Sequence, residues 1–356
     1  MNKLNVCVLF GGISPEHEVS LRSAESVLCN LNAEKYNILP VGITKTGKWL
    51  LFGGNDYSDL PDGSWETNPD NCAVTISPVR DQGLICFKGE HAETISLDVV
   101  FPVLHGENGE DGSVQGLMQL AGIPCVGPDV AASAVAMDKT LTKLVMDKAE
   151  IPQAAWLPVE SAQLSDHIEE IMDKIEATFV FPVFVKPAGT GSSVGVSKAA
   201  NRDSLRKALY HAGQYDQTIL VEEFIHGAEI EVAVMGNENP VASVCGEIDS
   251  GAEFYDYEAK YVTDSSVAYI PARIPEDVAE QVREYAVKAY TALRCTGLSR
   301  VDFFVTYEGN RIVFNEINTL PGFTSISMYP KLFAASGIPY DQLLDTLLSY
   351  ALEARR

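Results

Sequence analysis

Residues 5–21 read NVCVLFGGISPEHEVSL, and this stretch decides the fold class of the first part of the chain. The predicted strand runs from Asn5 to Phe10 and is apolar from Val6 onward, which is typical of a buried strand. An apolar period of three to four residues then runs from Leu21 to Leu31, as in an amphipathic helix, and a second apolar run follows at 38–43. Strand, helix and strand in this order predict an α/β fold that begins with a doubly wound parallel sheet.

The rest of the chain predicts two further structural units. Its 356 residues exceed one typical compact domain of roughly 100–200 residues, so two or three domains with a cleft between them are expected. Apolar runs and turn signals predict a strand at 98–104, a helix at 130–149, strands at 180–186 and 194–198, a helix from 203, a strand at 218–223, a helix at 275–293, a hairpin at 299–318 and a closing helix from 340. We place an N-terminal Rossmann-like domain at 1–128, a central unit at 129–223 and a C-terminal unit at 224–356, and we expect the two later units to be α+β.

The formal net charge of −23 argues against polyanionic partners. A strongly negative surface repels nucleic acid and anionic membranes, so a phosphate compound would have to be bound by clustered cations, backbone N–H groups or metal ions. No apolar run approaches the ~18 residues of a membrane span, and the first run is too short for a signal peptide. The seven cysteines form no CxxC pair, and the six histidines show no zinc-ligand spacing. We therefore expect a cytoplasmic protein with no nucleic-acid or membrane partner.

Two carboxylates and an amide fall on the hairpin predicted at 299–318. Because side chains alternate along a strand, Arg300 and Asp302 share a face of one strand, and Glu316 and Asn318 share a face of the other. A register with Asp302 opposite Glu316 would bring three oxygen ligands together, a donor set that suits Mg²⁺. The sequence leaves this register open, and a solvated hairpin face is the alternative.

The segment FPVFVKPAGTGSSVG at 181–195 joins a lysine to a glycine-rich loop. Lys186 and the bare backbone N–H groups after it could bind phosphate oxygens, whereas a flexible hairpin tip is the plain alternative. The loop also contains GSSVG, which matches a nucleophile elbow with Ser193 as nucleophile and gives a second hypothesis, a serine hydrolase. This hypothesis is disfavoured because a strand rather than a helix is predicted next, and because His211 and His226 lie too near the serine in sequence.

Other polar residues carry weaker signals when taken singly. Glu18 follows a strand and two glycines near a helix start, a common place for a ligand-binding loop, although it could simply be a first-turn charge. Lys139 and Lys260 would by default be solvated surface lysines. Glu222 and Glu223 end a strand and could form a domain hinge.

Taken in order, these segments resemble the D-alanine–D-alanine ligases of the ATP-grasp superfamily. Eight matches in one order, spanning nearly the whole chain, make coincidence a poor explanation. The resemblance implies a two-part ATP-grasp fold after the N-terminal domain. The matching segments are FGG at 10–12 with HEVS at 17–20, LHG at 104–106 with GEDG at 109–112, MDK at 137–139, VKP at 185–187 with GSSVG at 191–195, VEEF at 221–224, FYDYEAKY at 254–261, SRVD at 299–302 and NEINTLPGFTS at 315–325.

The resemblance also implies where the nucleotide and the metal would bind. Adenosine would sit between the two later domains, with Glu222 and the backbone near Ile225 at the adenine and Glu229 at the ribose. Ser193 and Glu223 belong to the same nucleotide set. The phosphates would be held by three lysines, Lys139, Lys186 and Lys260. Two Mg²⁺ ions, for which Mn²⁺ could substitute, would be bound by Asp302, Glu316 and Asn318.

The remaining implied residues belong to the two D-alanine sites. Glu18 would take the ammonium of the first D-alanine, and Arg300 with the backbone of Gly322 would face the developing oxyanion. Ser327 and Met328 would position the carboxylate of the second D-alanine, and His105 belongs to the same substrate set. Ser192 and Tyr261 would link to Glu18 and close a lid over the site.

The implied reaction is ATP-dependent formation of D-alanyl-D-alanine through an acyl phosphate, for cell-wall precursor synthesis. ATP is needed because a carboxylate is a poor electrophile, and no side-chain nucleophile is required. Ligases that make D-alanyl-D-lactate or D-alanyl-D-serine, other carboxylate–amine ligases and a silent nucleotide-binding protein are the alternatives. We expect D-alanine and ATP as small-molecule partners and a homodimer as the assembly.

Overall fold

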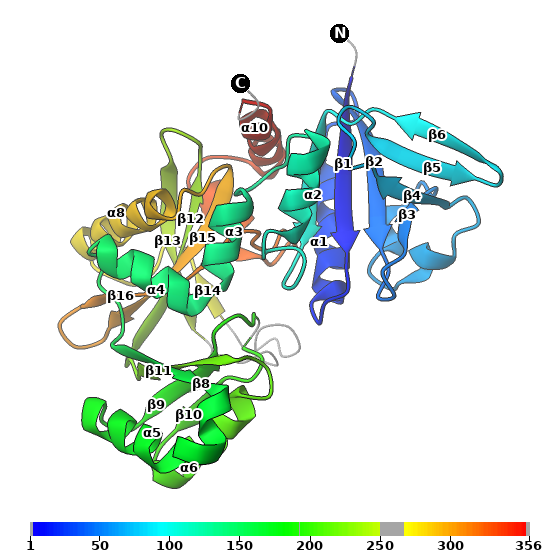
Figure 1. Cartoon of the computed structure of the whole chain (residues 1–356). Coiled ribbons are helices and arrows are strands. Elements are labelled where there is room, and N and C mark those ends of the chain that lie inside the picture. The colour runs from blue at the N-terminus through cyan, green and yellow to red at the C-terminus, as the bar shows by residue number, and fades with distance from the viewer. Residues whose placement is uncertain (1–2, 192, 250–266, 354–356) are drawn as a thin grey trace.

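Three β-sheets organise the chain in the computed structural model, which describes residues 3–191, 193–249 and 267–353. A seven-stranded sheet comes first in the sequence, followed by a four-stranded and a five-stranded sheet. Figure 1 shows the first sheet at the N-terminal end of the colour ramp, the four-stranded sheet in green, and the five-stranded sheet beside the first. The expected succession of an α/β domain and a two-part ATP-grasp region is thus present.

The N-terminal sheet has the order β6-β5-β4-β3-β2-β1-β7. Strand β1 pairs in parallel with β2 and β7, whereas β3 to β6 form an antiparallel meander, so the sheet is mixed rather than wholly parallel. The bounds are β1 (Leu4–Gly11), α1 (His17–Asn30), β2 (Tyr36–Ile43), β3 (Trp49–Leu51), η1 (Tyr57–Asp59), η2 (Ser64–Thr67), β4 (Cys72–Ile76), β5 (Leu84–Lys88), β6 (His91–Ile95), β7 (Val99–Leu104) and α2 (Ser113–Ala121).

Both faces of the sheet are buried at β1, which explains why this strand is apolar from Val6 to Phe10. Val6 and Val8 pack with residues of α1, while Cys7 and Leu9 on the opposite face pack with residues of α2. Strand β7 ends at Leu104, immediately before His105, and β1 ends at Gly11, the first of two glycines. The loops at this edge of the sheet are therefore held in place by a rigid core.

The four-stranded sheet has the order β10-β9-β11-β8, and helices α5 and α6 pack against it. The loop between β9 and β10 carries the glycines. The predicted strand at 194–198 is wrong at its start, because residues 193–195 form a turn, Ser193 and Gly195 have positive φ angles, and the strand begins at Ser197. The bounds are β8 (Trp156–Glu160), η3 (Ser161–Gln163), α5 (Leu164–Thr178), β9 (Val183–Pro187), β10 (Ser197–Ala199), α6 (Arg202–Ala212) and β11 (Thr218–Glu223).

The five-stranded sheet has the order β14-β13-β12-β15-β16 and packs against α8 on one face and α9 on the other. The last helix, α10, returns to contact α1 and β7, which joins the C-terminal unit to the N-terminal sheet (Figure 1). The bounds are β12 (Gly227–Met235), β13 (Val241–Asp249), β14 (Val267–Tyr269), α8 (Glu276–Ala292), β15 (Leu298–Thr306), β16 (Ile312–Asn318), α9 (Met328–Ala335) and α10 (Tyr340–Glu353).

The single helix predicted at 130–149 is wrong, because the structure has two helices, α3 (Val130–Met137) and α4 (Lys139–Lys148). Asp138 lies between them in an extended conformation, and its side chain accepts hydrogen bonds from the backbone N–H groups of Thr140 and Leu141. The first N–H groups of a helix have no partner within the helix, so a carboxylate that accepts from them stabilises a helix start at this position. The break places Lys139 at the first position of α4.

Of the helices in residues 3–191, 193–249 and 267–353, none is long and apolar enough to cross a membrane.

Candidate active site

A cavity of about 530 Å³ lies between the four-stranded and five-stranded sheets. Strands β9 and β11 contribute one wall, and strands β12, β15 and β16 contribute the facing wall. Lys260 lies outside the described residues. All the other residues predicted for the nucleotide line this one cavity: Lys139, Lys186, Ser193, Glu222, Glu223, Ile225 and Glu229.

One part of the cavity is lined by aromatic rings. Phe184 and Phe224 lie with ring centroids 5.9 Å apart, and Phe304 and Phe314 reach the cavity from the facing sheet. Flat apolar walls of this kind favour a planar ring such as a purine. The charged residues Lys186 and Glu316 line the same cavity, so an apolar base and a phosphate chain could both be accommodated.

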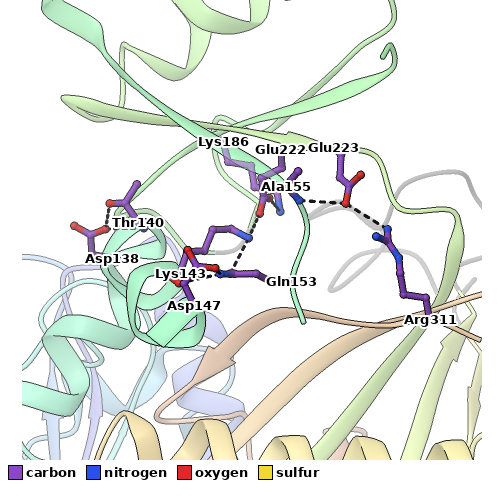
Figure 2. Close-up of polar contacts among 10 residues, drawn as sticks. All are labelled: Asp138, Thr140, Lys143, Asp147, Gln153, Ala155, Lys186, Glu222, Glu223 and Arg311. Carbon is purple, nitrogen blue, oxygen red and sulfur yellow. Dashed lines mark hydrogen bonds and ion pairs between the residues drawn. The ribbon is translucent and has the colours of Figure 1, made fainter. Parts of the chain in front are cut away.

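The carboxylate of Glu222 is held by two lysines. Its Oε1 lies 2.5 Å from Nζ of Lys143, and its Oε2 lies 2.6 Å from Nζ of Lys186. Burial alone would raise the pKa of Glu222, but the two ammonium groups overcome that effect and lower its pKa to about 2. Glu223, the next residue, points the other way and contacts the backbone N–H of Ala155 and the guanidinium of Arg311 (Figure 2).

Lys139 lies beside the glycine loop. Its ammonium donates to the carbonyl of Thr190 over 2.6 Å, and its backbone N–H donates to the carbonyl of Ala188 over 3.0 Å. The break at Asp138 is what brings this lysine to the loop. Ser192 lies outside the described residues, and Ser193 is followed by a turn and then β10. The strand–turn–helix context of a nucleophile elbow is therefore missing at Ser193.

The hairpin has the register on which the metal prediction depends. Asp302 of β15 pairs with Glu316 of β16, and Arg300 pairs with Asn318. Asp302 is buried, and the amide of Asn318 donates to it over 2.9 Å. Two carboxylates and an amide oxygen are donors that Mg²⁺ accepts, so this residue set fits the ion. Within the described ranges, no group of three or more His, Cys, Asp or Glu side chains is placed to hold a metal.

Arg300 forms a fork with Asp302. Its Nε and Nη2 donate to the two carboxylate oxygens over 2.8 and 2.7 Å, and Nε also lies 3.1 Å from Glu231. Burial would lower the pKa of Arg300, but the carboxylates of Asp302 and Glu231 raise it well above its usual value. A fixed positive charge thus stands beside the predicted metal ligands.

The structure does not bring Glu18 to this region. Its side chain is half exposed and pairs with Lys45, which is the largest cause of its lowered pKa. Glu16, by contrast, is only 9% exposed. A side-chain carbon added to Gly106 would lie 2.6 Å from the Glu16 carboxylate, and one added to Gly191 would lie 3.5 Å from it. Glu16 therefore sits where the N-terminal domain meets the glycine loop.

His105 and Glu110 form a buried polar cluster near Glu16. Nδ1 of His105 contacts the carbonyl of Leu320 at 3.0 Å, and burial lowers the pKa of His105. Glu110 accepts from the backbone N–H groups of Gly106 and Leu320. Its burial, together with the neighbouring Glu16 carboxylate, raises the pKa of Glu110 to about 8.

The predicted residues of the second D-alanine site surround the start of α9. Ser327 is the residue before the helix, and its hydroxyl contacts both the backbone N–H and the hydroxyl of Thr324. A side-chain carbon on Gly322 would lie 2.7 Å from that hydroxyl, so a larger residue would crowd it. The side chain of Met328 is buried in the core, which leaves its backbone N–H as the group that could meet a ligand.

Three polar residues of the site region were missed in the sequence. Glu110 lies within the GEDG motif at 109–112, and Glu16 stands two residues before the predicted Glu18. Lys143 lies four residues after Lys139, so a helical reading puts both on one face of α4. That spacing was the available signal for Lys143. Tyr261 and Lys260 lie outside the described residues.

Comparisons with known proteins cover nearly the whole chain. The family model described as D-ala D-ala ligase N-terminus matches residues 5–128, and the model described as D-ala D-ala ligase C-terminus matches residues 145–349. The D-alanine–D-alanine ligase of Acetivibrio thermocellus is 49% identical, with 99% of this chain and 96% of the relative covered. That of Caldicellulosiruptor bescii is 50% identical, with 100% and 97% covered.

Solved structures agree with these relatives. The D-alanine–D-alanine ligase of Coxiella burnetii superposes with a TM-score of 0.85 at 34% identity, covering 100% of this chain and 95% of that one. The VanG D-Ala:D-Ser ligase of Enterococcus faecalis superposes with a TM-score of 0.89 at 39% identity, covering 98% and 100%.

Proposed function

The chain belongs to the D-alanine–D-alanine ligase family and is an ATP-dependent ligase of that kind; on this premise we propose that the cavity between its two later sheets is the nucleotide site. The observation that carries the proposal is that this single cavity gathers residues from β9, β11, β12 and β16. Its aromatic walls suit adenine, and its charged end suits phosphates.

Four charged side chains of the cavity have a part in holding the nucleotide. Glu222 accepts from the adenine amino group, and Glu229 accepts from the ribose hydroxyls. Lys139 and Lys186 hold phosphate oxygens. Lys260 is assigned to the same task on the resemblance alone.

The hairpin supplies the metal site in this proposal. Asp302, Glu316 and Asn318 would hold Mg²⁺, or Mn²⁺ in its place, through hard oxygen donors. When bound, the ion supplies positive charge that offsets the repulsion between ATP and a carboxylate.

The reaction proceeds in two steps that each bring negative charges together. A carboxylate oxygen of the first D-alanine attacks the γ-phosphorus, and ADP leaves with the electrons of the broken P–O bond. The neutral amine of the second D-alanine then attacks the acyl carbon, loses a proton, and phosphate departs. Arg300 is placed to stabilise the oxyanion of the tetrahedral intermediate, together with the backbone N–H of Gly322.

We assign the ammonium of the first D-alanine to Glu16 rather than Glu18. The support is that Glu16 is buried where the glycine loop meets the N-terminal domain, whereas Glu18 is half exposed and paired with Lys45. The carboxylate of the second D-alanine would be held by Ser327 and the first N–H of α9, because a helix start favours negative charge.

The test combines turnover with binding. Phosphate release is measured with ATP and D-alanine, L-alanine, D-serine or D-lactate, and each product is identified by mass. D-alanine-dependent release is expected, and ADP binding should weaken in Glu229→Ala, with Glu238→Ala as a control on the β12–β13 turn. Unchanged ADP affinity in Glu229→Ala would contradict the ribose assignment.

The VanG neighbour makes D-serine the acceptor to test beside D-alanine. A product ratio that favours D-alanyl-D-serine when both acceptors are equal would identify a D-serine ligase. We also propose that the enzyme works in the cytoplasm, where ATP is available, and as a homodimer, which sedimentation would test.

A further inference from the structure

Lys143 is a lysine with a buried ammonium group behind the nucleotide cavity. It lies on α4, its side chain is 2% exposed, and it is not among the described residues that line the cavity. Its ammonium nevertheless contacts Glu222 of β11 at 2.5 Å. Burying a lysine is costly unless its charge is paired, so the position of this side chain requires an explanation.

The partner of Lys143 is a carboxylate that already has another lysine. Glu222 gives one oxygen to Lys143 and the other to Lys186 (Figure 2). The two lysines differ in their access to the cavity, because Lys186 lines it and its side chain is 17% exposed. Lys186 can therefore reach a ligand, whereas Lys143 can act on one only through Glu222.

Lys143 is held in place by Gln153, which follows the end of α4. The side-chain amide of Gln153 donates to the backbone carbonyl of Lys143 over 2.9 Å and to Asp147 over 2.5 Å. The carbonyl oxygen of Gln153 lies 3.5 Å from the Lys143 ammonium. Helix α4 also packs against α8 of the C-terminal unit. The ion pair thus connects a strand of the four-stranded sheet to the body of the protein.

We propose that Lys143 is a positioning residue for ATP, which fixes and permanently neutralises the Glu222 carboxylate so that Lys186 is left free to hold phosphate. The proposal rests on the nucleotide site proposed above. Without Lys143, Lys186 would be the one cation left for the buried carboxylate of Glu222. The carboxylate would then compete with the phosphate for the ammonium of Lys186. With Lys143 in place, the carboxylate keeps a cation when Lys186 turns to the ligand.

The test uses four variants of the full chain. Lys143→Met removes the ammonium and keeps the length of the side chain. Lys148→Met makes the same change at an exposed position of the same helix and serves as the matched control. Glu222→Gln and the double variant Lys143→Met/Glu222→Gln complete the cycle. Each is measured for ADP affinity by calorimetry, for the KM values of ATP and D-alanine, and for thermal unfolding.

We expect Lys143→Met to weaken ADP binding and raise the KM for ATP about 10- to 100-fold, the effect of losing one charge-assisted contact. The KM for D-alanine at saturating ATP should stay within about twofold of wild type, which a general loss of structure would not allow. The double variant should bind ADP no worse than Glu222→Gln, since Lys143 acts only through that carboxylate.

Three results would overturn the proposal. One is Lys143→Met behaving like Lys148→Met, and another is a double variant that binds clearly more weakly than Glu222→Gln. The third is Glu222→Gln binding ADP as well as wild type does. This result would contradict the adenine contact of Glu222 as well, whereas the first two results would contradict only the role of Lys143. If Lys143→Met does not fold, the comparison of the double variant with Glu222→Gln decides alone.

Discussion

Replacing Arg300 by alanine should remove both a transition-state contact and a buried counter-ion. The guanidinium makes two hydrogen bonds to Asp302, of 2.8 and 2.7 Å, and lies 3.1 Å from Glu231. Breaking a buried pair from one side costs about 3–5 kcal/mol, since the carboxylates left behind lose their cation. Loss of one preorganised oxyanion donor lowers turnover by about 10²- to 10³-fold. Arg300→Lys should fall between, because an ammonium keeps the charge and loses the fork.

Turnover is measured at saturating ATP, well below the unfolding temperature of each variant, and ADP affinity and urea unfolding are measured beside it. The matched control is Arg206→Ala, which breaks an exposed pair with Glu169 and should cost at most about 1 kcal/mol. A collapse of ADP affinity with little change in turnover at saturating ATP would show that Arg300 binds ground-state phosphate. A loss of unfolding free energy in Arg300→Ala no larger than that in Arg206→Ala would refute the counter-ion argument.

Three more predictions follow from other parts of the site. Asp302→Asn should abolish phosphate release at ordinary Mg²⁺ in a folded protein, and near-normal turnover would make the hairpin purely structural. Tyr261→Phe, a prediction from the sequence alone, should shift product from dipeptide towards D-alanyl-D-lactate, most visibly at the acid end of about pH 6 to 9; an unchanged ratio would speak against it. Because the pKa of Glu110 is raised to about 8, its folded form keeps a proton that the unfolded chain has lost, so stability should fall as pH rises towards 8. The midpoint of urea unfolding should fall less steeply between about pH 6.5 and 8 in Glu16→Gln than in wild type, whereas Glu18→Gln should leave the slope unchanged. Equal slopes in the two variants would exclude an effect of Glu16 on the pKa of Glu110.

The sequence by itself determined most of the local elements and the family, although it missed the break at Asp138 and the turn at Ser193. The strand at 218–223 has the predicted bounds in the structure, and the last helix begins at Tyr340 as expected. Such elements can be predicted because apolar periods of 2 and 3.6 are local properties of the chain. The ordered motifs also predicted the ligase activity, and the comparisons confirm it.

Only the tertiary structure decided which polar groups meet. Strand alternation allowed several registers for the hairpin, and pairing within the sheet placed Asp302 opposite Glu316. Residues two apart near a helix start point in nearly opposite directions, and the path of the loop placed the Glu16 side chain beside Gly106 and Gly191 while Glu18 pairs with Lys45. Lys143 was missed for the same reason. Its spacing from Lys139 indicated only a shared face of α4, and the approach of β11 brought Glu222 to Lys143 to form a buried ion pair. Periodicity states which side a residue is on, whereas contacts between distant segments decide what it touches there.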